Sequence, residues 1–127
     1  MPIIQLINHE KFIDRIMDLD ENIRYATIFD MDGNQKVSRV RRGVKPYLDT
    51  DETKETLKTS ANAWKSRMKH YDKIGKGLYV LAVYENLRRV TVPLKDNHLM
   101  LVTIDNKGSR DIIDRILNQL YGDYTKY

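Results

Sequence analysis

The spacing of apolar residues along the chain switches between the period of a helix and the period of a strand. After Asn8, apolar side chains recur at one, three and four positions as far as Leu19, which predicts a short helix with Asn8 as its N-cap. Residues 23–30 then alternate between the two faces of a predicted strand. An Asp-Gly pair at 32–33 favours a tight hairpin turn into a second strand over 35–41. That strand has few apolar residues and several arginines, which is typical of a sheet edge.

The second half of the chain predicts a long helix, three strands and a last helix. One apolar seam from Leu57 to Tyr71 indicates a helix from about 51 to 74, with Gly75 as its C-cap. Residues 77–84 are apolar on both faces, which is typical of a central strand covered on two sides. Further strands are expected over 87–92 and 98–105, and Ser109 is expected to cap the final helix.

This order of elements, α-β-β-α-β-β-β-α, predicts an α/β fold of the α+β type. Short hairpins join the strands, so we expect one five-stranded, mostly antiparallel sheet that the helices cover. The chain has 127 residues, a length that supports one hydrophobic core. Residues 1–127 are therefore expected to form a single domain.

The amino-acid composition excludes several classes of functional site. The sequence contains no cysteine, which excludes disulfides, thiolate metal sites and cysteine nucleophiles. Residues 1–7 lack the basic leader and the long apolar run of a signal peptide or membrane span, so we expect a cytoplasmic protein with no membrane partner. The net charge of +4 permits an acidic partner but does not require one.

Two segments resemble the roadblock/LC7 domain, which belongs to the wider profilin-like and longin-like group. Residues 23–37, which include the stretch YATIFDMDG at 25–33, look like the opening hairpin of that family, and residues 99–108 look like its final strand and turn. The chain also resembles small uncharacterised archaeal proteins through Phe29-Asp30…Gly33 and Trp64-x-x-Arg67. The resemblance implies a non-enzymatic regulatory or scaffold module that forms a homodimer and binds another protein, by analogy a small GTPase or a sensory component.

The Asp30-Met31-Asp32-Gly33 segment also resembles the first motif of haloacid-dehalogenase-type phosphatases. That mechanism further requires a Ser/Thr, a Lys and an acidic pair at the ends of parallel strands, and Asn34 departs from the threonine of that family. The glycines of residues 73–77 follow a helix and enter a strand, which is the reverse of a phosphate-binding loop. We therefore predict a hairpin turn at 30–33 and no enzymatic activity.

The three histidines give no recognisable metal motif. His9, His70 and His98 fall in different predicted elements, and none is four residues from another as two ligands on one helix would be. They are expected to be ordinary surface or strand-end histidines. The sequence predicts neither a metal nor a cofactor.

Two surfaces are candidates for binding. A dimer interface is expected on the exposed side of the long helix, which would include Ala61, on the neighbouring strand edge, or on both, although a tryptophan on such a seam is more often a core residue. A basic patch suited to nucleic acid runs along a sheet edge, although charged edge strands are commonly just solvated. The interface candidates are Ala61, Trp64, Lys65 and Met68, and the basic candidates are Arg39, Arg41, Arg42, Lys45, Arg88 and Arg89.

A small-molecule sensor of the PAS, GAF or profilin-like kind is the other function left open. In that case the sheet and the long helix would enclose a ligand cavity. The aromatic residues expected to line it are Tyr25, Trp64, Tyr79 and Tyr84.

Overall fold

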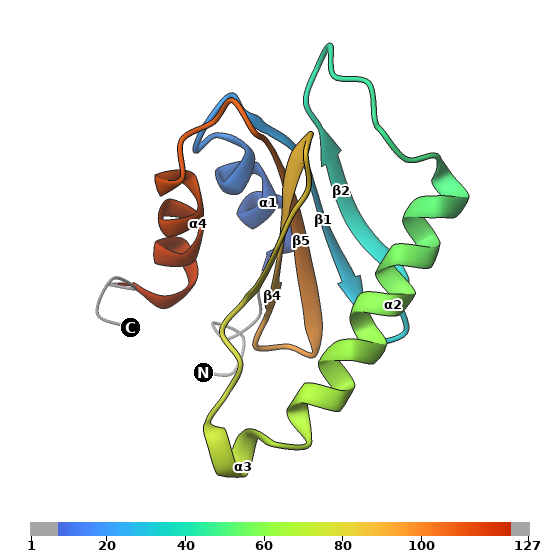
Figure 1. Cartoon of the computed structure of the whole chain (residues 1–127), viewed down its shortest axis with the longest axis vertical. Helices are drawn as coiled ribbons and strands as arrows, with labels where there is room; N and C mark the ends of the chain where they lie inside the picture. The colour runs from blue at the N-terminus through green and yellow to red at the C-terminus, as the bar shows by residue number, and fades with distance from the viewer. Residues whose placement is uncertain (1–7, 123–127) are drawn as a thin grey trace.

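Five antiparallel strands form one sheet in the computed structural model, which describes residues 8–122 (Figure 1). The strands lie in the order β2-β1-β5-β4-β3, and every neighbouring pair is antiparallel. The predicted order of elements and the α+β class are confirmed. The strands are β1 (Ile23–Asp30), β2 (Gln35–Val40), β3 (Val80–Val83), β4 (Leu87–Pro93) and β5 (His98–Asp105). The helices are α1 (His9–Met17), α2 (Thr50–Met68), α3 (Tyr71–Ile74) and α4 (Asp111–Tyr121).

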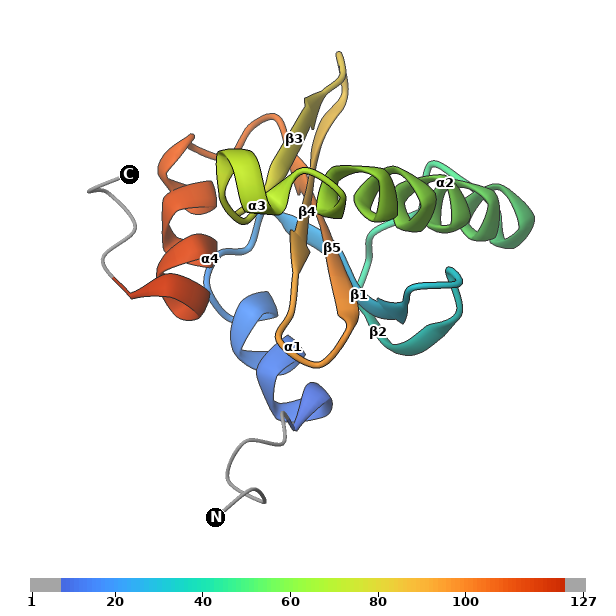
Figure 2. The same ribbon diagram turned by 90° about the horizontal axis from the view of Figure 1, so that it is seen from below.

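The helices cover the two faces of the sheet unequally. Helices α1 and α4 lie on one face, and α2 crosses the other (Figures 1 and 2). The apolar cluster between the sheet and α1 and α4 is large, with Ile16 and Ile116 among its fully buried members. The cluster under α2 is smaller and centres on Trp64, Leu57 and Phe29. Among residues 8–122, no helix has the length and apolar character needed to cross a membrane.

The long helix differs from its prediction because it is interrupted near its end. Helix α2 ends at Met68, and the backbone N–H groups of Lys69 and His70 bond carbonyls three residues back, which tightens the chain before α3. Gly75, with φ of 88°, then caps α3 rather than one continuous helix. After this cap Gly77 passes against the Trp64 ring, where a methyl group on Gly77 would lie 2.6 Å from a ring carbon.

The strand after α3 also differs from its prediction. It is shorter than residues 77–84 and lies at the sheet edge, not at the centre. Its apolar side chains are partly open to solvent, with Leu81 39% exposed and Val83 66% exposed. Apolar residues on both faces therefore reflect an uncovered edge here, and not burial on two sides. The prediction of an edge at β2 is confirmed.

Two of the four interface candidates on α2 face the sheet, which corrects the expectation of an exposed Ala61. Ala61 and Trp64 are each 1% exposed, and the Trp64 indole Nε1 donates a hydrogen bond of 3.2 Å to Thr91 Oγ1 on β4. Lys65 lies on the outer side, where its ammonium is 3.6 Å from the Asp32 carboxylate, and Met68 is half-buried. The apolar seam of α2 therefore packs in the core of a single chain.

Candidate functional site

Asp30 organises the β1–β2 turn and is not placed as a nucleophile. Its Oδ1 accepts hydrogen bonds of 2.9 Å from the backbone N–H groups of Asp32 and Asn34, and Lys36 lies 3.5 Å from Oδ2. The bond from the Asn34 backbone contributes most to lowering the pKa of Asp30 to about 2. At the tip, Gly33 has a φ of 87° and lies against the backbone of α2, so a side chain has no room there.

Asp30→Asn is expected to destabilise the protein by roughly 1 to 2 kcal/mol at pH 7 because it weakens charge-assisted bonds that hold the turn. A lowered folded-state pKa adds stability above the unfolded pKa near 3.8, and that stability is lost as the pH falls toward about 2. Urea unfolding at pH 7 and pH 3 tests both points: the difference between wild type and variant should shrink at pH 3. The matched control is Asp32→Asn. Magnesium-dependent phosphatase turnover that Asp30→Asn abolishes would contradict this assignment.

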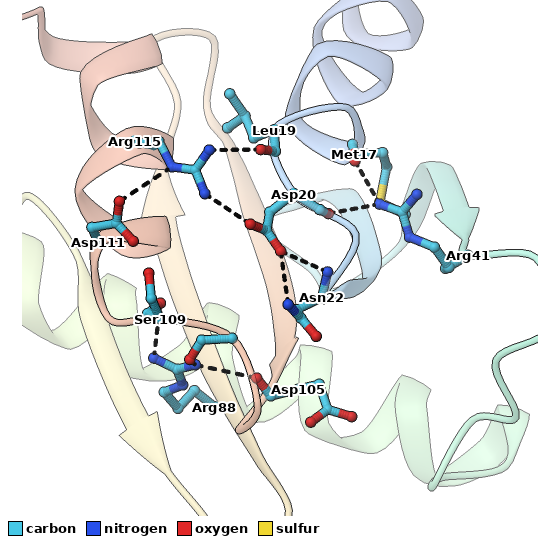
Figure 3. A network of polar contacts seen from close by, with 11 residues as sticks. Met17, Leu19, Asp20, Asn22, Arg41, Arg88, Asp105, Ser109, Asp111 and Arg115 are labelled. Carbon is cyan, nitrogen blue, oxygen red and sulfur yellow. Dashed lines mark hydrogen bonds and ion pairs between the residues drawn. The ribbon is translucent and has the colours of Figure 1, made fainter.

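The expected basic patch does not assemble, because two of its arginines serve the fold. Arg41 donates hydrogen bonds of 2.5 to 2.9 Å to the carbonyl oxygens of Met17, Asp20 and Ile23, which closes the loop after α1 (Figure 3). Arg39 pairs with Asp14 of α1 at 2.9 Å. These contacts tie β2 and the residue after it to α1 and the loop that follows α1. The Arg41 guanidinium is taken up by backbone carbonyls, whereas the Arg39–Asp14 ion pair lies at the surface.

The remaining basic candidates are spread over the molecule. Arg88 is 6% exposed and donates to the carbonyl oxygens of Asp105 and Gly108 in the β5–α4 turn (Figure 3). Arg89 projects from the opposite face of β4, and β4 is separated from β2 by two strands. Arg42 and Lys45 are exposed in the segment after β2. The six residues therefore do not form one continuous surface.

The α2 face of the sheet contains a groove of about 830 Å³ that the sequence did not locate. Its walls are the N-terminal half of α2, the segment that leads into that helix and the β3–β4 turn, and its floor is the sheet. Leu101 lies on the floor, and the exposed side chains of Tyr47, Leu48 and Tyr84 stand at the rim. The groove exists because α2 alone does not cover this face of the sheet.

Two guanidinium groups, of Arg24 and Arg89, line the groove together with two carboxylates, of Asp49 and Glu85. Arg89 is half-buried and donates a 3.1 Å hydrogen bond to Thr56 Oγ1, and burial lowers its pKa. Arg24 lies over the Tyr47 ring, 4.4 Å from its centroid, and is 3.6 Å from the Asp105 carboxylate. A mostly apolar groove with a half-buried cation is chemically suited to a ligand that carries an anionic group.

The aromatic residues expected to line a cavity divide between two places. Tyr25 and Tyr84 line the groove. Trp64 belongs to the core beneath α2, and Tyr79 packs against the cluster formed by α1 and α4. The predicted cavity of four aromatic residues is thus only half present.

The structure brings two histidines together, contrary to the expectation of isolated ones. His9 of α1 and His98 of β5 have ring centroids 4.8 Å apart, and both lie against Asp96. His70 stays apart, exposed in front of α3. The Asp96-x-His98 spacing was the sequence feature that could have pointed to this cluster, but nothing in the neighbouring sequence connects it with His9.

Comparison with known proteins rests on structure alone, because no family model and no curated protein matches the sequence. A roadblock/LC7 domain from Streptomyces avermitilis matches with a TM-score of 0.65 at 10% identity, over 92% of this chain and 94% of that one. The gliding protein MglB from Thermus thermophilus matches with a TM-score of 0.66 at 10% identity, over 93% and 91%. The fold is that of a roadblock/LC7 domain. Profilin II of Acanthamoeba castellanii also matches, with a TM-score of 0.52 at 14% identity over 92% and 98%.

This roadblock/LC7 fold leaves a strand edge open beside its long helix. Within residues 8–122, β3 pairs only with β4, so the backbone groups along its other side have no strand partner. The flank of α2 toward β4 carries small side chains, Thr56, Ser60 and Ala63, which are half-buried. An apolar edge strand beside a helix flank of small residues forms a surface to which a second strand and helix can be added.

Proposed function

We propose that this protein is a non-enzymatic regulatory or scaffold module that acts in the cytoplasm as a homodimer and binds another protein. The observation that carries the proposal is the unpaired β3 edge next to a sheet face that one helix covers incompletely. Natural proteins rarely leave an apolar sheet edge without a charge, a bulge or a partner. A second copy of the chain supplies such a partner.

A two-fold axis at the β3 edge explains how the copies would fit. Antiparallel pairing of β3 with its own copy extends the sheet across both chains and sets the two α2 helices side by side. On the flank of α2 that carries the small residues, acidic Glu52 lies near the N-terminal end and basic Arg67 near the C-terminal end, which suits this arrangement. Antiparallel helices place the unlike charges opposite each other, which favours one register.

The fold neighbours support an assembling module. One matched MglB structure is described as having a tetrameric arrangement. By fold analogy alone we extend oligomerisation to this chain and propose a small GTPase or a sensory component as the further partner. Of the interface candidates on α2, Lys65 lies on the opposite flank, beside Asp32 of the β1–β2 turn, so the proposed surface rests on Leu81 and Val83 of β3 and on the small residues of α2.

Val83→Asp is expected to convert the dimer to a monomer, because it places a charge within an apolar strand pairing. Sedimentation velocity at micromolar protein measures the change, and circular dichroism verifies that the variant is folded. The control is Ile74→Asp, which changes an apolar residue that is 83% exposed and lies outside β3. If folded Val83→Asp keeps the wild-type sedimentation coefficient, β3 is not the interface.

A small-molecule sensor is the second candidate function, and the groove on the α2 face of the sheet favours it. A ligand with an apolar body and a carboxylate fits the apolar floor near Leu101 and the half-buried Arg89. Arg89→Gln is expected to weaken the binding of such a ligand by roughly 10- to 100-fold, because it removes a charge-assisted hydrogen bond. Thermal-shift screening of aromatic and aliphatic carboxylates measures this, with Arg42→Gln as control. No carboxylate-dependent shift in the wild type would remove the sensor function.

A further inference from the structure

We propose that His9, Asp96 and His98 form a binding site for one divalent transition-metal ion of the zinc class. His9 opens α1, whereas Asp96 lies in the β4–β5 turn and His98 begins β5. His9 and Asp96 are 87 positions apart in the sequence, so only the fold brings the three side chains together. None of them belongs to β3 or α2, so this site is independent of the proposed dimer.

The distances among the three side chains are close to those of a metal site. His9 Nε2 lies 2.7 Å from Asp96 Oδ2, and His98 Nδ1 lies 3.3 Å from Asp96 Oδ1 and 2.9 Å from the backbone carbonyl oxygen of Asp96. One nitrogen of each imidazole and one carboxylate oxygen all lie within 4.8 Å of one another. Ligand atoms about 2.0 to 2.2 Å from a tetrahedral ion are about 3.4 Å apart. The side chains reach that spacing by rotation, in which His98 either binds through Nε2 or exchanges the hydrogen bond between Nδ1 and the Asp96 carbonyl oxygen for the ion.

The backbone around the cluster presents its side chains in a fixed way. The backbone N–H of Leu94 donates a 2.8 Å hydrogen bond to the carbonyl oxygen of His98, which closes the turn. Asn97, which stands between Asp96 and His98, adopts a left-handed conformation with φ of 62° within this turn. The site is therefore largely preformed, and ordering it on binding costs little entropy.

The donor set selects the class of ion. Two imidazoles and one carboxylate suit Zn²⁺, Co²⁺ and Ni²⁺, whereas Mg²⁺ and Ca²⁺ prefer sites made of oxygen atoms. Asp96 Oδ1 is shielded from solvent and accepts no hydrogen bond from residues 8–122, although the side chain as a whole is 31% exposed. A cation next to this oxygen would satisfy it. Three protein ligands leave one position of a tetrahedral ion for water or for a group from a partner.

Cobalt and zinc titrations of the full chain test the site. The protein is prepared without a histidine tag, treated with a chelator and exchanged into chelator-free buffer. Co²⁺ absorption and calorimetry with Zn²⁺ should both report one ion per chain, and a tenfold excess of Mg²⁺ should not compete. Absence of saturable binding by both ions would overturn the proposal.

Variants decide whether these residues hold the ion. His98→Ala and His9→Gln should each weaken Zn²⁺ binding by about tenfold or more, since each removes a ligand. His70→Ala removes a histidine elsewhere and should bind as the wild type does. Circular dichroism verifies folding, and His9→Gln provides the answer if His98→Ala does not fold. Equal losses in His70→Ala and His9→Gln would show non-specific binding and overturn the assignment.

Discussion

Trp64→Ala is expected to lower the free energy of unfolding by about 3 to 5 kcal/mol, a large part of the stability of a small domain. Trp64 is 1% exposed and is the largest side chain in the cluster under α2. Truncation empties the space between α2 and the sheet and leaves Thr91 without its indole partner. It also removes the ring against which Gly77 passes, so the turn from α3 into β3 loses its support.

Urea unfolding followed by circular dichroism measures this effect without relying on tryptophan fluorescence. Ile74→Ala is the control, because Ile74 is 83% exposed and its truncation is expected to change stability by less than about 0.5 kcal/mol. A Trp64→Ala variant that unfolds at the wild-type urea concentration would show that α2 does not pack on the sheet through this residue.

Arg88→Met is expected to destabilise the protein by roughly 2 to 4 kcal/mol. The arginine is 6% exposed. Its guanidinium donates hydrogen bonds to the backbone carbonyl oxygens of Gly108, at 2.6 Å, and Asp105, at 3.2 Å. Methionine keeps part of the aliphatic packing but leaves those carbonyls without their donor. The turn that connects β5 to α4 would then lose its tie to β4 (Figure 3).

The same unfolding measurement applies, with Arg42→Met as a matched control because Arg42 is exposed after β2. The control should unfold within about 0.5 kcal/mol of the wild type. Equal stability of Arg88→Met and Arg42→Met would mean that solvent can replace the guanidinium, and Arg88 would then be an ordinary surface cation.

Local features were predictable from sequence because neighbouring residues produce them. Asn8 caps α1 through its side chain, which accepts from the Lys11 backbone N–H, and Asp30 with Gly33 makes the hairpin turn. Ser109 is an exception, because α4 begins at Asp111 without any side-chain cap. Here the helix start is set by packing on the sheet more than by its first residues.

Features that depend on contacts distant in sequence were not predictable. The apolar pattern of β3 is compatible with a centre or an edge, and only the pairing of β1 with β5 places it at the edge. Arg41 and Arg88 look in the sequence like members of a basic patch. In the fold they instead donate hydrogen bonds to backbone carbonyl oxygens of loops that are distant in the sequence. The contact of His9 with Asp96 joins residues 87 positions apart, and no local spacing encodes it.

The mass of the 127-residue chain in solution tests the central proposal most directly. Light scattering coupled to size-exclusion chromatography compares that mass with the 15.0 kDa of one chain. Samples from low to high micromolar protein concentration show whether the measured mass depends on concentration. A homodimer predicts twice the mass of one chain across the upper part of that range. A mass of one chain that persists at the highest concentration would contradict the homodimer and favour the ligand-sensing function of the groove.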